Sequence, residues 1–262
     1  MALYLLFRRE KAWQRPRLRL VRADAPTVDG FVTCCGEDVD LVMGMVRAAS
    51  SQDYPPCSYR VFLLDDAQSP ELEDAIQAYN QQKGQQHAQQ AVRYLARTKA
   101  PGKPHYFKSG NLCFGIEESS KIRPLSEYIG ALGVDAIPET DWLRRMVPHL
   151  VVDSKMDAIV AGLRHYNLPA GDPLGQDIAT PSDITIEHMR DAMGVTNLYG
   201  SGYVMRRAAL QDIGGWPLAP SAEDLYCGHL LAGAGRGVGF CWDVCQHDLS
   251  PGSLDALSKH WR

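Results

Sequence analysis

The chain has 262 residues, of which 45% are hydrophobic and 22% are charged, and its formal net charge is -4 at pH 7. This length and composition suffice for one large globular domain and exclude a disordered, collagen-like or disulfide-scaffold protein. A slightly negative chain has no overall positive field with which to neutralise phosphates, so nucleic acid is not expected as a partner. No run of hydrophobic residues approaches the about 20 that a membrane-spanning helix needs.

Cysteine usage indicates a reducing compartment. The seven cysteines are an odd number spread along the chain, and the close groupings are Cys34 with Cys35 and Cys241 with Cys245. Neither grouping has the partner ligands of a zinc site, and adjacent cysteines bridge each other only with strain. We therefore predict reduced thiols in the core of a cytoplasmic protein.

The first 27 residues form a basic segment. One interpretation is a solvated basic tail. The other is a juxtamembrane segment in peripheral contact with anionic lipid at the cytoplasmic face of a membrane, because clustered basic side chains are attracted to such a surface. The hydrophobic start is too short for the core of a signal peptide, and seven basic residues follow it: Arg8, Arg9, Lys11, Arg15, Arg17, Arg19 and Arg22.

From residue 28 onward, short hydrophobic runs alternate with amphipathic stretches. Helical spacing of hydrophobic residues predicts helices over residues 38–51 and 70–82. The alternation predicts an α/β fold with a mostly parallel central sheet flanked by helices, in one domain from 28 to 262. The glutamine-rich run 81–90 is expected to be a solvated loop. The expected strands are residues 28–35, 59–66, 91–97, 127–135, 156–164 and 237–244.

Ligands of open α/β sheets bind beyond the carboxyl ends of the strands, so polar residues there are candidates for function. The first expected strand ends near Thr33, and Glu37 and Asp38 follow in a polar loop. This loop offers a hydroxyl group and backbone amides to a nucleotide. Glu37 and Asp38 would serve equally well as favourable charges in the first turn of a helix.

The pair Asp65 and Asp66 closes the second expected strand. Two carboxylates at a strand end can bind a base, a ribose hydroxyl or a metal ion. Considered alone, the pair is more typical of a helix N-cap, because an aspartate commonly accepts the free amides of the helix that follows it.

Two further segments carry groups that suit a diphosphate and a cation. Lys108 precedes an expected helix, where its charge and the helix-start amides would bind phosphate, although surface lysines are common there. Asp135 ends the fourth expected strand shortly before Pro138. A carboxylate in that place is a plausible ligand for a hard divalent ion, but one carboxylate does not specify a metal.

Near the C-terminus, Gly200, Ser201 and Gly202 form a small-residue run that lets a substrate approach the backbone closely, or that simply turns the chain into a strand. Glu223 and Asp224 open an amphipathic stretch. A capping role for these two acids therefore competes with a catalytic role.

Taken in order, these segments resemble the cytosolic domain of family 2 glycosyltransferases of the cellulose-synthase-like kind. The resemblance covers about residues 28–262, and its motifs in this chain are TCCGED, DDA, HYFKSGN, GVDAIPE, GSGYVMRR and SAED. A series of motifs in the right order is harder to produce by chance than any single motif.

The resemblance implies a GT-A fold and a UDP-sugar donor held with Mg2+ or Mn2+. It implies that a hexose, with glucose the default, passes with inversion to a glycan or small-molecule acceptor, and that Asp224 is the general base. The other implied roles are uridine binding by Thr33, Glu37, Asp65 and Asp66, diphosphate binding by Lys108, metal binding by Asp135, and an acceptor side formed by Gly200, Ser201, Gly202 and Glu223.

Three departures from the family pattern stand out. Gly133 occupies the place of the first aspartate of an Asp-x-Asp motif, so one carboxylate of the metal site is missing, which puts activity in doubt. Ala67 replaces the glycine that usually follows the aspartate pair. The chain ends at Arg262, where a Gln-x-x-Arg-Trp motif is expected, and Trp261 does not fit its spacing.

Two other function classes compete with the transferase. A catalytically impaired module that binds a nucleotide sugar or a partner is favoured by Gly133 and the missing C-terminal motif. A dinucleotide-dependent oxidoreductase would share the alternating pattern, but its Gly-x-Gly-x-x-Gly fingerprint is absent after the first expected strand, where CCGED stands instead.

Overall fold

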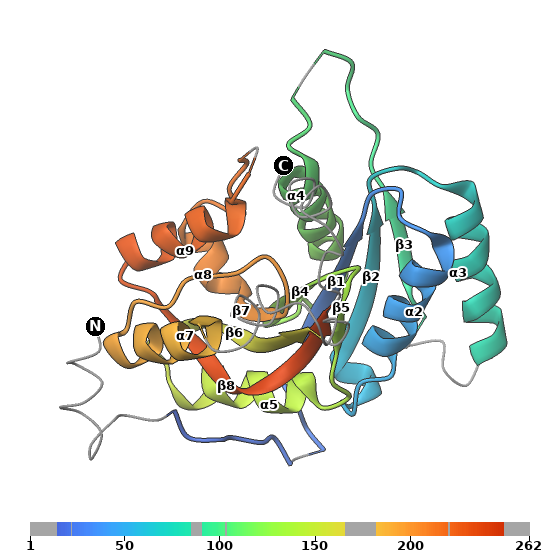
Figure 1. The fold of residues 1–262 in the computed structure, drawn as a ribbon. Helices are drawn as coiled ribbons and strands as arrows, with labels where there is room; N and C mark the ends of the chain where they lie inside the picture. The colour runs from blue at the N-terminus through green and yellow to red at the C-terminus, as the bar shows by residue number, and fades with distance from the viewer. Residues whose placement is uncertain are drawn as a thin grey trace, which may run out of the picture.

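The structure is a computed structural model that describes residues 15–21, 23–84, 91–102, 104–165, 182–219 and 221–248. Its centre is an eight-stranded sheet with the order β3-β2-β1-β4-β7-β6-β8-β5 (Figure 1). The strands are β1 (Val28–Cys34), β2 (Tyr59–Asp65), β3 (Arg93–Ala96), β4 (Tyr128–Gly133), β5 (Ala136–Pro138), β6 (Met156–His165), β7 (Tyr203–Arg206) and β8 (Gly237–Asp248).

The first four strands in the sheet order form the parallel half that the sequence predicts. Strand β1 pairs in parallel with β2 and β4, and β2 pairs in parallel with β3. All seven residues of β1 are buried. Both faces of this half are covered by helices, so its strands are nearly continuous hydrophobic runs without polar alternation.

The other half of the sheet is mixed. Strand β7 is antiparallel to both β4 and β6, β8 runs parallel to β6, and β5 returns antiparallel to β8. The predicted strands all occur, with their ends shifted by a few residues. Strands β5 and β7 were not among the predicted strands, because three or four residues are too few to show a periodic pattern.

Helices cover the sheet on both faces. Side chains of α2, α3 and α5 share one hydrophobic core with alternate strand residues such as Val32 and Leu63. The intervening residues Phe31 and Leu64 face a second core with α4, α8 and α9, which Figure 1 shows above the sheet. The helices are α2 (Val39–Ser50), 3-10 helix η1 (Pro56–Ser58), α3 (Pro70–Lys83), α4 (Phe107–Ser120), α5 (Trp142–Val152), α7 (Ser182–Met193), α8 (Arg207–Asp212) and α9 (Glu223–Gly233).

Part of the basic N-terminal segment contacts the body of the domain. Arg15 pairs with Asp191 of α7 at 2.5 Å, and Arg17 pairs with Asp243 of β8 at 3.1 Å. Arg19 also forms an ion pair, with Asp141. Residues 15–21 therefore lie along the domain surface and contact it through these ion pairs, whereas Arg8, Arg9, Lys11 and Arg22 lie outside the described residues.

Several other predictions can be placed in the structure. Cys34, Cys241 and Cys245 are buried free thiols, but Cys35 and Cys57 are exposed, so the prediction of a core position is wrong for these two. Cys35 follows the last residue of β1, where the chain leaves the sheet. Residues 85–90 of the predicted loop and the segment 249–262 lie outside the described residues. Within the described part of the chain, no helix is long and hydrophobic enough to span a membrane.

Candidate functional site

Three strand ends bring the predicted donor residues to one edge of the sheet. Thr33 of β1 is paired with Leu64 of β2 and with Gly133 of β4, and Cys34 is paired with Asp65. Neighbouring strands lie about 4.8 Å apart, so Thr33, Asp65 and Gly133 form one continuous rim. This rim is the carboxyl edge of the parallel half, where the fold class predicts a ligand site.

The loop after β1 is built by two acidic side chains. Glu37 Oε2 accepts a hydrogen bond from the backbone N–H of Cys35 at 2.5 Å, so its carboxylate is tied to its own loop. Asp38 is the N-cap of α2, and its Oδ1 accepts from the N–H groups of Asp40 and Leu41 at 2.9 and 3.3 Å. The helix-start role considered for these acids is thus confirmed for Asp38.

Asp65 is completely buried and organises the turn after β2. Its Oδ1 accepts from the N–H of Ala67 at 2.8 Å, and its Oδ2 accepts from the N–H of Ser69 at 2.7 Å and from the Tyr94 hydroxyl at 2.8 Å. The N-cap of α3 is Ser69, so the prediction that the aspartate pair caps this helix is wrong. Asp65 instead holds the turn that carries the cap.

Asp66 is buried between two cations. Arg97 Nε lies 2.6 Å from Asp66 Oδ1, and Lys99 Nζ lies 3.0 Å from Oδ2. The negative charge of Asp66 is therefore already compensated. The adjacent Cys34 thiol is neutral, because burial and, to a lesser degree, the Asp65 carboxylate raise its pKa far above the ordinary value.

Lys108 lies in the first turn of α4, whereas the sequence predicts that it precedes the helix. The helix begins at Phe107, and both Tyr106 and Phe107 have positive φ angles, of 54° and 39°. Such angles cost energy in residues other than glycine and cluster at functional sites. The Lys108 ammonium group donates a hydrogen bond to the carbonyl oxygen of Gly200.

Gly200 is the point where Lys108 and Asp224 meet. A β-carbon at position 200 would lie 3.0 Å from Lys108 Nζ and 3.1 Å from Asp224 Oδ2. The other carboxylate oxygen, Asp224 Oδ1, accepts from the N–H of Leu225 at 2.8 Å. Asp224 Oδ2 therefore faces Gly200, and the two charged side chains approach the same backbone position from α4 and α9.

The start of α9 is conformationally unusual. Its N-cap is Ala222, which has a φ of 52° and supplies no side-chain hydrogen bond to the helix. Glu223 is buried and Asp224 is half-buried in the first turn. Neither Glu223 nor Asp224 is therefore the N-cap of α9, which is Ala222. Both carboxylates lie in the first turn, where a negative charge interacts favourably with the helix dipole.

Asp135 lies in the turn between β4 and β5, beside Gly133. A β-carbon at position 133 would lie 2.7 Å from Asp135 Oδ1 and 3.7 Å from Ser201 Oγ. The backbone N–H of Gly133 donates to Ser201 Oγ at 2.9 Å. Asp135 and Ser201 of the small-residue run thus both lie next to Gly133. Gly133 is the position where the family pattern has the first aspartate of its Asp-x-Asp motif.

Gln246 of β8 belongs to the same cluster, and the sequence did not indicate it. Its Nε2 donates to the carbonyl oxygen of Ser201 at 3.2 Å, and its Oε1 accepts from Ser201 Oγ at 3.3 Å. Strand β8 was predicted to end at residue 244, so Gln246 was assigned to no element. Its position opposite Pro138 in the sheet is a tertiary relationship that no local pattern encodes.

The donor set fits a divalent ion held jointly by protein and ligand. Among the described residues, no three His, Cys, Asp or Glu side chains gather into a metal-binding group. The oxygens of Asp65 and Asp66 are engaged by amides, a hydroxyl and cations. Asp135, beside Gly133 in the turn after β4, is the carboxylate that could hold such an ion, whose other ligands would be diphosphate oxygens and water, a common arrangement for Mg2+.

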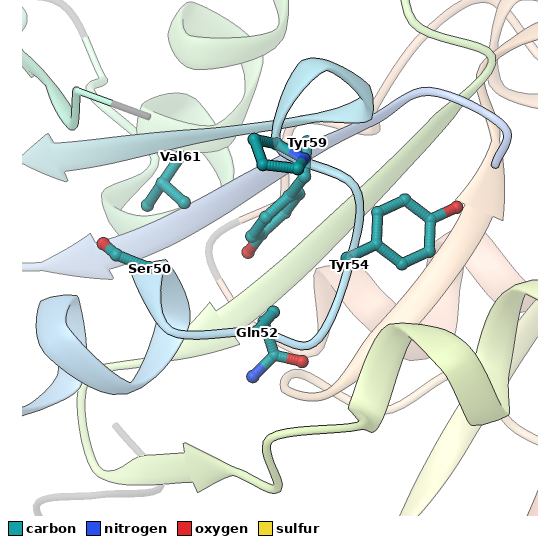
Figure 2. A pocket seen from close by; sticks show the side chains of 6 residues that line it. Ser50, Gln52, Tyr54, Tyr59 and Val61 are labelled. Carbon is teal, nitrogen blue, oxygen red and sulfur yellow. The ribbon is translucent and has the colours of Figure 1, made fainter. Parts of the chain in front are cut away.

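A small pocket lies elsewhere, at the start of β2. Figure 2 shows Tyr54 and Tyr59 in this pocket with Ser50, Gln52 and Val61. The Tyr59 hydroxyl and Gln52 Oε1 are buried there without a hydrogen-bond partner among the described residues. The pocket is at the amino end of β2, whereas Asp65 is at the carboxyl end, so it is separate from the rim.

Comparisons with known proteins identify the family of the chain. The family model described as "Glycosyltransferase like family 2" matches residues 26–261. A UDP-forming cellulose synthase from Komagataeibacter sucrofermentans (its catalytic subunit) is 29% identical over 212 residues, which are 78% of this chain and 25% of that relative. A UDP-forming cellulose synthase from Dictyostelium discoideum is 33% identical over 146 residues, covering 54% of this chain and 13% of the relative. The chain thus spans about a quarter or less of these relatives.

Solved structures show the same fold at low sequence identity. A Pyrobaculum calidifontis mannosyltransferase in complex with GDP-Man and Mn2+ matches with a TM-score of 0.68 and 18% identity, over 96% of this chain and 65% of that one. S. aureus TarS 1–349 in complex with UDP-GlcNAc matches with a TM-score of 0.59 and 12% identity, over 88% and 61%. The chain belongs to the family 2 glycosyltransferases, is similar to cellulose synthases, and has the GT-A fold.

Proposed function

We propose that this chain transfers a hexose from a UDP-sugar to a hydroxyl group of a glycan or small-molecule acceptor, with inversion at the anomeric carbon. The main observation in support is that the Lys108 ammonium group and the Asp224 carboxylate both lie against Gly200. Gly200 is next to the turn that holds Asp135. Glucose is the first sugar to test, because the curated relatives are UDP-forming cellulose synthases.

The donor would lie along the rim formed by β2, β1 and β4. Thr33, Glu37 and the Asp65–Asp66 turn would face the uridine, and the Lys108 ammonium group would contact the diphosphate as a compact positive charge. Asp135 would hold Mg2+ or Mn2+. When bound, this ion would neutralise charge on the departing diphosphate.

Asp224 would act as the general base. As the acceptor hydroxyl oxygen forms its bond to the anomeric carbon, its proton would pass to Asp224 Oδ2, and the bond from that carbon to the diphosphate would break with its electron pair leaving on UDP. The N–H of Leu225 holds Oδ1 at 2.8 Å, which fixes the carboxylate with Oδ2 toward Gly200. A positioned carboxylate suits this proton transfer. Glu223, Gly200, Ser201 and Gly202 would form the acceptor side.

We place the protein in the cytoplasm, with peripheral attachment to the cytoplasmic face of a membrane through its basic N-terminus. Arg15, Arg17 and Arg19 are paired with acidic residues of the domain, so attraction to anionic lipid would rest chiefly on the other four basic residues, Arg8, Arg9, Lys11 and Arg22. Co-sedimentation with phosphatidylserine vesicles, but not with neutral vesicles, is the expected result. Equal recovery with both would contradict the attachment.

A second candidate is a module that binds a nucleotide sugar without transferring it. It is favoured by Gly133, which supplies no carboxylate beside Asp135, and by the lack of a three-residue metal group among the described residues. This candidate predicts UDP-sugar binding with no release of UDP. Sustained turnover by the wild-type protein would exclude it.

Calorimetric titration tests the donor proposal directly. The purified chain would be titrated with UDP-glucose, UDP-GlcNAc and GDP-mannose, each with Mn2+ and with EDTA. We expect UDP-sugars to bind more tightly than GDP-mannose, and binding to weaken when Mn2+ is removed. Absence of binding by every UDP-sugar, or a preference for GDP-mannose, would refute the proposed donor class.

A further inference from the structure

Gln246 is a buried side chain that bridges the acceptor-side run to the far edge of the sheet. It is 2% exposed and lies in β8, opposite Pro138 of β5. Both ends of its amide group are used by one residue: Oε1 and Nε2 contact the hydroxyl and the carbonyl of Ser201. A buried amide with both ends paired fixes the geometry of its partner.

The hydrogen-bond directions along this bridge are determined by donor and acceptor counts. The N–H of Gly133 can only donate, so Ser201 Oγ accepts from it at 2.9 Å. The single hydrogen of the Ser201 hydroxyl is then free to go to Gln246 Oε1. This leaves Gln246 Nε2 to donate to the Ser201 carbonyl, as observed at 3.2 Å. One defined network therefore runs from β8 through Ser201 to the Gly133 backbone.

Packing reinforces the network at Gly202. This residue has a φ of 73°, and a β-carbon there would overlap the amide atoms of Gln246. The Gly202 carbonyl also accepts from Trp142 Nε1 at 3.3 Å, and its N–H donates to Ala131 of β4 at 2.8 Å. The glutamine amide therefore occupies the space that the absence of a side chain at position 202 leaves open.

We infer that Gln246 is a positioning residue for the transfer reaction: by holding Ser201 and Gly202 against β4, it places Gly200 where Lys108 and Asp224 meet. The inference rests on the proposed function. The hydrogen bonds of the Gln246 amide go to Ser201, so it would act on Lys108 and Asp224 through the backbone of residues 200–202. A neutral amide is needed, since a carboxylate at position 246 would replace the Nε2 donor by an oxygen, and that oxygen and the Ser201 carbonyl oxygen would then be two acceptors facing each other.

The test compares Gln246→Met, Gln246→Glu, Ser201→Ala and the Ser201→Ala/Gln246→Met double variant with the wild-type protein. Methionine keeps the length of the side chain and removes its hydrogen bonds. Gln52→Met is a matched control, because Gln52 also donates to two backbone carbonyls, of Ala48 and Glu139, but lies in the separate pocket. UDP release gives kcat and donor KM, and thermal unfolding gives Tm.

We expect Gln246→Met and Gln246→Glu to lower kcat by about 10-fold to 100-fold while donor KM changes by less than about 3-fold, which is typical of a defect in the transition state and not in donor binding. The double variant should lose no more than the worse single variant, because both changes break one network. Gln52→Met should lower Tm at most and leave kcat unchanged.

The outcomes separate this inference from the proposed function. If the wild-type protein releases UDP and Gln246→Met keeps kcat within about 2-fold, the positioning role is wrong and the transferase proposal stands. Additive losses in the double variant would also overturn the role. If Gln246→Met does not fold, Ser201→Ala decides, since it removes the two hydrogen bonds of Ser201 Oγ with a smaller change and keeps the one to the Ser201 carbonyl. A wild-type protein without turnover refutes both.

Discussion

The ammonium group of Lys108 and the carboxylate of Asp224 lie against the same glycine, although the two residues come from helices that are far apart in the sequence. Lys108 donates to the Gly200 carbonyl, and Asp224 Oδ2 lies 3.1 Å from the place of a β-carbon at that position. A positive group and a carboxylate thus lie near each other at one backbone position. In the proposed inverting displacement, Lys108 would attract the departing diphosphate, and Asp224 would take the proton of the acceptor hydroxyl on the opposite face of the anomeric carbon.

Replacing Lys108 by methionine should weaken donor binding. A hydrogen bond to a charged group contributes about 1.5 to 3 kcal/mol, so the affinity for UDP-glucose in calorimetry should fall by about 10-fold to 100-fold. Lys155→Met is the control, because Lys155 is an exposed lysine at the opposite end of β6 from the rim. Equal donor affinity in the Lys108 variant and the control would show that Lys108 does not bind the diphosphate.

Replacing Gly133 by aspartate should strengthen metal binding and weaken the metal-free fold. The new β-carbon would lie 2.7 Å from Asp135 Oδ1, so the Asp135 side chain must shift, and two carboxylates would then face each other. Mn2+ relieves their repulsion. Mn2+ titration followed by electron paramagnetic resonance should show tighter binding than in the wild-type protein, and the rise in Tm on adding Mn2+ should be larger. Gly133→Asn, which adds no charge, is the control and should show neither effect.

Asp65 and Asp66 should differ in what they support. Asp65→Asn removes an acceptor from buried N–H and O–H donors, which should lower the free energy of unfolding by about 2 to 4 kcal/mol in urea denaturation. Asp66→Asn keeps the hydrogen bonds of the turn but breaks the ion pairs with Arg97 and Lys99, so it should lower stability by a different route and should also weaken uridine binding in calorimetry. Uridine binding by Asp66→Asn at the wild-type affinity would contradict this assignment.

His188 should make the stability of the domain depend on pH. Burial lowers its pKa below the ordinary value of 6.5, and the Asp191 carboxylate opposes this only in part. Its ring stacks on Trp242 with centroids 3.9 Å apart and contacts Phe240, and its Nε2 is buried without a hydrogen-bond partner among the described residues. The unfolded chain therefore binds the proton more readily than the folded chain.

The free energy of unfolding is not reduced by His188 above pH 6.5, where the imidazole is neutral in both the folded and the unfolded chain. It falls as the pH drops through the lower pKa of the folded chain, because protonation then favours the unfolded chain. His188→Phe keeps the stacked ring and removes the titration. Its Tm should therefore decline less than the wild-type Tm between about pH 7.5 and about pH 5.5. The exposed His229, changed to Phe, is the control and should decline like the wild type. An identical decline in all three proteins would contradict this role of His188.

The parallel half of the sheet was predictable because each of its strands is a hydrophobic run that ends in a polar residue. That pattern places Thr33, Asp65 and Asp135 at one edge on sequence grounds alone. Strand β7 has four residues and reverses the strand direction between β4 and β6. Its direction depends on pairing with strands that are distant in the sequence, so the local pattern of hydrophobic residues does not predict it.

The candidate site was predictable only in part for the same reason. Asp65 and Asp66 were assigned together to uridine, but the first is held by turn amides and Tyr94, and the second by Arg97 and Lys99. The partners outside the turn lie about 30 residues further along the chain, on or just after β3. The sequence did not indicate Gln246, because its contacts are with Ser201 and Gly202, which are close in space but remote in the chain.

Release of UDP from UDP-glucose in the presence of Mn2+, measured for the wild-type protein and for Asp224→Asn, tests the central claim most directly. Asp40→Asn, in an exposed carboxylate of α2, is the control. We predict wild-type turnover, an equal rate for Asp40→Asn, and a rate lower by about 100-fold to 10,000-fold for Asp224→Asn with donor affinity retained. Turnover by Asp224→Asn at the wild-type rate, or none by the wild-type protein with any UDP-sugar, would contradict the account.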